Sequence, residues 1–114
     1  MSVSDATYGD LDYDGFVASL QGMAPPLTAG PTLRALWYDA NDRHESALRA
    51  ANADESHSCL RVRAYLGRKA GDARGAQRHY WLSGSTPWQG TSESEWEDIV
   101  RGVLVEVIVE RSYL

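Results

Sequence analysis

The segment that most constrains the fold is residues 64–84, whose pattern is typical of two helices joined by a tight turn. Gly71 can adopt a positive φ without steric cost, which suits the position just beyond a helix end. Asp72 follows it and can accept hydrogen bonds from the free N–H groups that begin the next helix. Ala64 and Ala76 flank the turn with small side chains, so the two helices can approach closely. The segment therefore predicts an antiparallel helical hairpin.

This hairpin resembles a tetratricopeptide repeat at its small-residue, turn-glycine, alanine and aromatic positions, which are Ala64, Gly71, Ala76 and Tyr80. It differs from that repeat at two positions, because Gly67 stands in place of an aromatic residue and Ser83 in place of an alanine. The resemblance implies a fold of stacked antiparallel helical hairpins.

A second, fainter copy of the pattern lies upstream. Ala35 and Ala47 each lie 29 residues before the matching alanines of the first copy, Ala64 and Ala76, and Asp42 takes the place of the turn glycine. This offset is shorter than the tetratricopeptide period of about 34 residues, and stacked repeats usually number at least about three. We therefore expect two related hairpins with a shortened connection, and further helices at the ends that complete the core.

The chain also resembles a group of small uncharacterised bacterial helical proteins. The shared segments are Ala35-Leu36-Trp37, Arg68-Lys69, Gly71-Asp72 and Glu95-Trp96-Glu97. The chain departs from the group at Arg63 and Gly67, where the group has histidines. The resemblance supports a helical fold and implies no particular activity.

The remaining pattern predicts about six helices in all. The first contains Leu11 and Leu20 and ends near Gly22, the second begins at Pro31, and the third contains Ala47. Ser56 or Ser58 caps the fourth, which together with the fifth forms the first hairpin described above. The expected fold is all-α, with stacked tetratricopeptide-like hairpins closed by a C-terminal amphipathic helix. Residues 10–114 form a single helical domain and residues 1–9 a flexible acidic tail.

The C-terminal helix has the clearest pattern. Ser92-Glu93-Ser94-Glu95 fits a capping box, with Ser92 bonding forward and Glu95 reaching back. Apolar residues then follow at helical spacing, at Trp96, Ile99, Val100, Val103, Leu104, Val107 and Ile108. The β-branched residues of 103–109 also suit a strand, but a lone strand lacks a partner, so we predict a helix with Trp96 and Leu104 buried.

Composition narrows the class of protein. The net charge of −5 is wrong for a bulk nucleic-acid binder, and no apolar run reaches the length of about 18 residues that a membrane span needs. The single cysteine excludes an internal disulfide and favours a reducing compartment. The first residues lack the basic start and apolar stretch of a signal peptide. We expect a cytoplasmic protein that binds neither nucleic acid nor membrane.

The sequence contains no recognisable catalytic or metal-binding pattern. The three histidines, His44, His57 and His79, lie on separate predicted elements without metal-ligand spacing. Asp10, Asp12 and Asp14 resemble the start of a calcium loop, but no glutamate stands at its twelfth position. Without a nucleophile and base that could be paired, we expect a non-enzymatic protein with no metal and no cofactor.

The candidate site is a basic face on the fourth predicted helix. In tetratricopeptide-like stacks the first helix of each hairpin lines the groove, and this resemblance implies groove positions at Ser58, Arg61, Tyr65, Arg68 and Lys69. Residues 61–78 hold six basic residues and one acidic residue. One interpretation is a groove for a carboxylate-rich peptide or another anionic partner. The other is internal neutralisation, by the acidic tail or by residues 93–98.

The function that follows is a small protein-interaction or adaptor module, which binds a protein partner or self-associates. The alternative is a binder of a small anionic ligand.

Arg63 lies on the packed side of its helix, where an arginine is costly unless paired. We therefore predict that Arg63 is partly buried against a carboxylate, with Asp39 and Asp42 as candidates.

Overall fold

The computed structural model describes the backbone of residues 11–112 and the side chains of residues 11–105. The predicted acidic tail, residues 1–9, lies outside the described residues. Within the described range the chain forms six helices and no strand, which confirms the all-α prediction. The helices are α2 (Tyr13–Ser19), α3 (Pro31–Ala40), α4 (His44–Ala51), α5 (His57–Lys69), α6 (Ala73–Ser83) and α7 (Ser92–Ser112).

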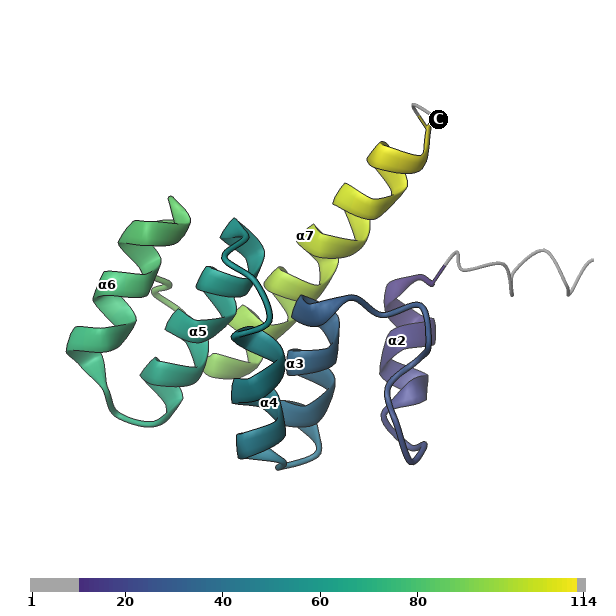
Figure 1. Cartoon of the computed structure of the whole chain (residues 1–114), viewed down its shortest axis with the longest axis horizontal. Helices are drawn as coiled ribbons and strands as arrows, with labels where there is room; N and C mark the ends of the chain where they lie inside the picture. Colours follow the sequence, from purple (N-terminus) through teal and green to yellow (C-terminus); the bar gives the residue numbers. More distant parts are fainter. Residues whose placement is uncertain (1–10, 113–114) are drawn as a thin grey trace, which may run out of the picture.

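The helices α3 and α4, and then α5 and α6, form two hairpins in the same register (Figure 1). Helices α3 and α5 end 29 residues apart, at residues 40 and 69, and α4 and α6 begin 29 residues apart, at residues 44 and 73. The turn residues Asp42 and Gly71 both have a positive φ, of 59° and 82°. Arg43 N–H donates to the carbonyl of Tyr38 at 2.9 Å, and Asp72 N–H donates to that of Gly67 at 2.8 Å. The predicted 29-residue offset between the hairpins is confirmed.

Small side chains allow α5 and α6 to pack closely. Ala64 and Ala76 are buried together with Tyr80, and Trp88 packs against them. A Cβ atom added at Gly67 would lie 3.6 Å from the Cβ of Ala76, so the two helices are in contact at this point. The predicted caps of these helices are present, since the Ser56 hydroxyl accepts from Cys59 N–H and the Asp72 carboxylate accepts from Gly75 N–H.

The main core lies between the hairpins, α2 and α7. Its largest buried side chains include Phe16, Leu36, Trp37 and Leu66. Helix α7 packs against α2, α3 and α5, and its last turns extend past the other helices (Figure 1). No helix in the described part of the chain is long and apolar enough to cross a membrane.

Helix α7 includes residues 103–109, so the helical alternative for this segment is confirmed. Leu104 is buried, as predicted. The prediction that Trp96 is buried is wrong: its side chain packs against the edge of the core and is only partly buried, and its indole N–H donates to the carbonyl of Leu36 at 3.0 Å.

The predicted capping box at the start of α7 is wrong. Thr91, not Ser92, supplies the cap, since its hydroxyl accepts a hydrogen bond from Ser94 N–H at 3.0 Å. Glu95 does not reach back to a capping N–H, because its carboxylate turns into the interior of the molecule.

Candidate interaction site

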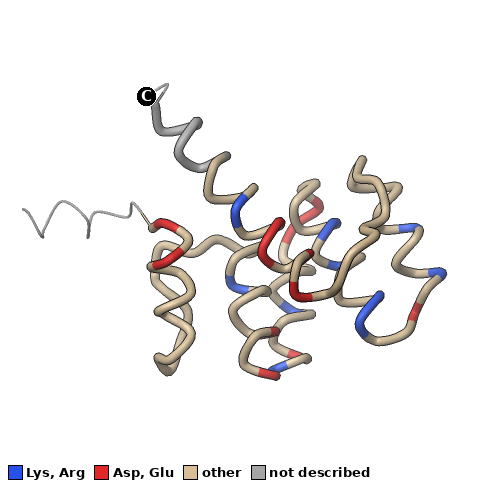
Figure 2. Tube along the Cα trace, turned by 180° about the vertical axis from the view of Figure 1, so that it is seen from behind, with Lys and Arg blue, Asp and Glu red and all other residues tan. Residues whose placement is uncertain are grey.

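Ser58, one of the five predicted groove positions, lies in the first turn of α5, which begins at its Ser56 cap. The other four positions lie further along the same helix. The structure divides them between two buried carboxylates: Arg61 and Arg68 lie against Glu95 of α7, while Tyr65 and Lys69 lie against Asp39 of α3. Figure 2 shows the basic residues of α5 and the acidic residues of α7 close together in the middle of the molecule.

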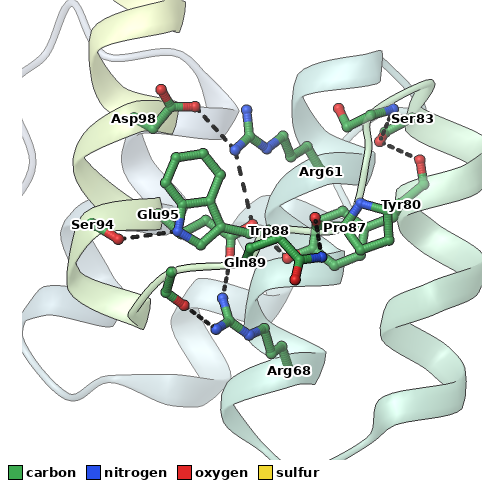
Figure 3. A network of polar contacts seen from close by, with 12 residues as sticks. Arg61, Arg68, Tyr80, Ser83, Pro87, Trp88, Gln89, Ser94, Glu95 and Asp98 are labelled. Atoms are coloured by element: carbon green, nitrogen blue, oxygen red, sulfur yellow. Dashed lines mark hydrogen bonds and ion pairs between the residues drawn. The ribbon is translucent and has the colours of Figure 1, made fainter.

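Glu95 is the centre of the first half. Its side chain is 0% exposed. Its Oε1 accepts from Arg68 Nη1 at 3.0 Å, and its Oε2 accepts from the Tyr80 hydroxyl at 2.5 Å (Figure 3). Arg68 also donates to the carbonyl of Gly90, which ties the loop before α7 to α5. One carboxylate thus joins α5, α6 and α7.

Arg61 occupies the outer edge of the same network. Its Nη2 lies 3.1 Å from Asp98 Oδ2 and 3.9 Å from Glu95 Oε2. Its guanidinium lies 5.6 Å from the centre of the Trp88 ring, and the Trp88 indole N–H donates to Ser94 Oγ (Figure 3). Within the described part of the chain, the buried Nε of Arg61 has no hydrogen-bond acceptor.

Asp39 is the centre of the second half. Its Oδ2 accepts from the Tyr65 hydroxyl at 2.6 Å, and its Oδ1 accepts from Lys69 Nζ at 2.9 Å. The Lys69 ammonium also lies 5.4 Å from the centre of the Tyr65 ring. As at Glu95, a buried carboxylate accepts hydrogen bonds from one phenol and one cation.

Both tyrosines act as hydrogen-bond donors at neutral pH. Burial raises the pKa of the Tyr80 hydroxyl to about 12, with the hydrogen bond to Glu95 adding to the effect. Burial also raises the pKa of Tyr65, and its bond to Asp39 raises it further. The charged form of a phenol is unfavourable in such surroundings, so each hydroxyl keeps its proton and satisfies a carboxylate oxygen.

These contacts correspond to internal neutralisation of the basic face. The acidic segment 93–98 supplies the carboxylates for Arg61 and Arg68, as one of the two interpretations of the sequence expected. Asp39, which neutralises Lys69, is one of the two residues that the sequence predicts as partners of Arg63. The interpretation of residues 61–69 as a groove for an anionic partner gains no support from these contacts.

Arg63 is partly buried as predicted, with its side chain 11% exposed. Its predicted partners, however, are wrong. The guanidinium pairs with Glu55 at 3.0 Å and donates to the carbonyls of Ala51 and Asp54. Arg63 therefore fastens α5 to the end of α4 and to the loop between them, while Asp39 is taken up by Tyr65 and Lys69.

A cleft of about 470 Å³ opens beside Tyr65 and Lys69, between α2, α3, α5 and α7. We call it the interhelical cleft. It is lined by Tyr13, Leu20, Asp39, Ala40, Asp42, Tyr65, Lys69, Ser92, Glu93, Trp96 and Glu97. Sequence reasoning missed most of these residues, because they come from four separate segments and no linear motif joins them. The cleft combines aromatic side chains with charged groups.

Comparisons with known proteins found no matching family model, no similar curated protein and no similar solved structure. Among the described residues, no group of three or more histidine, cysteine, aspartate or glutamate side chains could hold a metal ion.

Proposed function

We propose that this chain is a small protein-interaction module that binds a protein partner at the interhelical cleft. The observation that carries this proposal is the cleft itself, in which the partly exposed rings of Tyr13 and Trp96 come together from two different helices. Aromatic side chains dominate the energetics of protein interfaces, because they bury a large area at low entropic cost. Here they stand on helices, which hold them in place.

The repeated hairpin supports the same class of function by analogy of fold. Stacked helical hairpins form extended surfaces that bind other proteins. The proposal also includes three expectations from the sequence. The hairpins stack as in tetratricopeptide repeats, the chain belongs with the small bacterial helical proteins that it resembles, and the protein is cytoplasmic. Fold analogy by itself does not assign a function, so the proposal rests on the cleft.

The alternative, a binder of a small anionic ligand, is less well supported. Arg61 and Arg68 already face Asp98 and Glu95, so an anion would have to displace these carboxylates. Lys69 is similarly paired with Asp39. We therefore do not retain the anionic ligand as a second candidate.

Site-specific photo-crosslinking in the native cell tests the proposal. A photoreactive amino acid replaces Glu93, an exposed residue that lines the cleft. The matched control replaces Gln77, an exposed residue of α6, which does not contribute to the cleft. We expect a discrete crosslinked product with another protein from position 93 and not from position 77. An excess of the chain without the photoreactive amino acid should abolish this product.

Two results would contradict the proposal. Identical products from positions 93 and 77 would show that the cleft has no special role. A product containing only two copies of this chain would assign the cleft to self-association instead of to a separate partner.

A further inference from the structure

The interhelical cleft has an acidic lining. Its charged residues are four carboxylates, Asp39, Asp42, Glu93 and Glu97, and one cation, Lys69. This composition is the opposite of the basic groove that the α5 sequence predicted. Such a lining attracts positively charged groups and repels acidic ones.

Two cations of the chain itself already bind aromatic side chains of the cleft. Lys69 lies over the ring of Tyr65 while its ammonium pairs with Asp39. Arg101 lies over the ring of Tyr13, with its guanidinium carbon 3.9 Å from the ring centre, and pairs with Glu97 at 2.8 Å. In both cases an aromatic face and a carboxylate share one cation, which is a favourable combination.

Two other carboxylates of the cleft take part in neither pair. Asp42, at the α3–α4 turn, and Glu93, in the first turn of α7, are exposed and form no ion pair among the described residues. Trp96 lies on the same lining and is only partly buried. The cleft therefore offers further negative charge beside an accessible aromatic ring.

We infer that the interhelical cleft receives an arginine-containing segment of the protein partner, with Asp42 and Glu93 as its acidic rim. This inference rests on the proposed function, which it extends by stating the partner's chemistry. Arginine fits better than lysine, because its planar guanidinium can stack on an aromatic ring while it donates to carboxylates. A volume of about 470 Å³ has room for such a side chain and its neighbours.

A peptide titration of the full chain tests this inference. The probe is a blocked seven-residue peptide with two arginines among glycines and serines, and its control has two glutamates instead. Nuclear magnetic resonance follows the indole N–H signals of the four tryptophans. We expect the arginine peptide to shift the signal of Trp96 and not that of Trp81, which is exposed on α6 outside the cleft. Added salt should weaken the effect.

Two sets of substitutions check that the acidic rim is responsible. Asp42→Asn combined with Glu93→Gln removes both unpaired charges, and asparagine tolerates the positive φ at position 42. We expect this double variant to bind the arginine peptide about three- to tenfold more weakly. Glu45→Gln, which removes an exposed carboxylate of α4 outside the cleft, should leave binding unchanged.

The inference is overturned if the Trp96 signal does not move, if both peptides move it equally, or if Glu45→Gln weakens binding as much as the double variant. The crosslinking experiment separates this failure from that of the proposed function. A specific partner at position 93 without arginine-peptide binding would refute only the chemistry inferred here. Peptide binding without a crosslinked partner would contradict the proposed function and leave only the affinity of the cleft for arginine.

Discussion

At the scale of single residues, Glu95 and Asp39 connect the helices of this protein. Each carboxylate is buried and accepts hydrogen bonds from one tyrosine and one cation, which both lie on α5 for Asp39 and on α6 and α5 for Glu95. Burying a charge is costly, and the cost is offset only when hydrogen bonds and an opposite charge replace the lost water. The two clusters therefore favour the one arrangement of helices in which all of their partners meet.

Replacing Glu95 with alanine should destabilise the protein strongly. It leaves Arg68 without its carboxylate and the buried Tyr80 hydroxyl without its acceptor. Removing one partner of a buried ion pair typically costs about 3–5 kcal/mol. Glu97→Ala is the matched control on the same helix, because it breaks a half-exposed pair with Arg101 and should cost at most about 1 kcal/mol. Urea unfolding measures both, and equal losses would contradict the role assigned to Glu95.

At the scale of elements, the start of α7 shows how a local signal can be ambiguous. The sequence Thr91-Ser92-Glu93-Ser94-Glu95 offers two residues that can cap a helix, Thr91 and Ser92. A cap at Ser92 would form a capping box with Glu95. The chain instead begins the helix one residue earlier, so that Ser94 meets the Thr91 hydroxyl and Glu95 is free to enter the interior.

Alanine substitutions at the two candidate caps distinguish these arrangements. Thr91→Ala removes the hydroxyl that accepts from Ser94 N–H and should lower the free energy of unfolding by about 1 kcal/mol. Ser92→Ala should change it much less, because residue 92 is already the first residue of the helix. Chemical denaturation of the two variants gives the comparison, and a larger loss at Ser92 would restore the original capping box.

At the scale of the whole molecule, α7 adds to the packing between the two hairpins and joins α2 to them. It packs against α2, α3 and α5, so it connects α2 to both hairpins (Figure 1). Two hairpins alone fall short of the roughly three repeats that a stable stack usually needs. The long helix that crosses them supplies the missing apolar surface through Ile99, Val100 and Leu104.

Truncating Leu104 tests this closing role. Leu104→Ala should cost about 2–5 kcal/mol, a large share of the roughly 5–15 kcal/mol that stabilises a small domain. The adjacent Val105 is 58% exposed, so Val105→Ala should change stability by no more than about 0.5 kcal/mol. Thermal unfolding followed by circular dichroism measures both variants. An unchanged melting temperature for Leu104→Ala would mean that α7 does not close the core.

The sequence by itself determined the local features of this protein. The turn at Gly71, its copy at Asp42 and the apolar stripe of α7 depend on contacts within a few residues, and short-range patterns such as helical spacing and turn chemistry encode them. This is why the two hairpins and the helical fold could be predicted.

Only the tertiary structure decided which charges meet. Arg68 pairs with Glu95, which lies 27 residues away in the sequence, and Lys69 pairs with Asp39, which lies 30 residues away. Composition alone would have allowed either cation to pair with another carboxylate. The interhelical cleft likewise takes its walls from four helices. Helical spacing shows which residues share a face, but the packing of that face against other helices determines whether a basic stretch becomes a binding groove or is neutralised. In this chain the packing of α7 and α3 against α5 neutralised the basic face and left an acidic, aromatic cleft beside it.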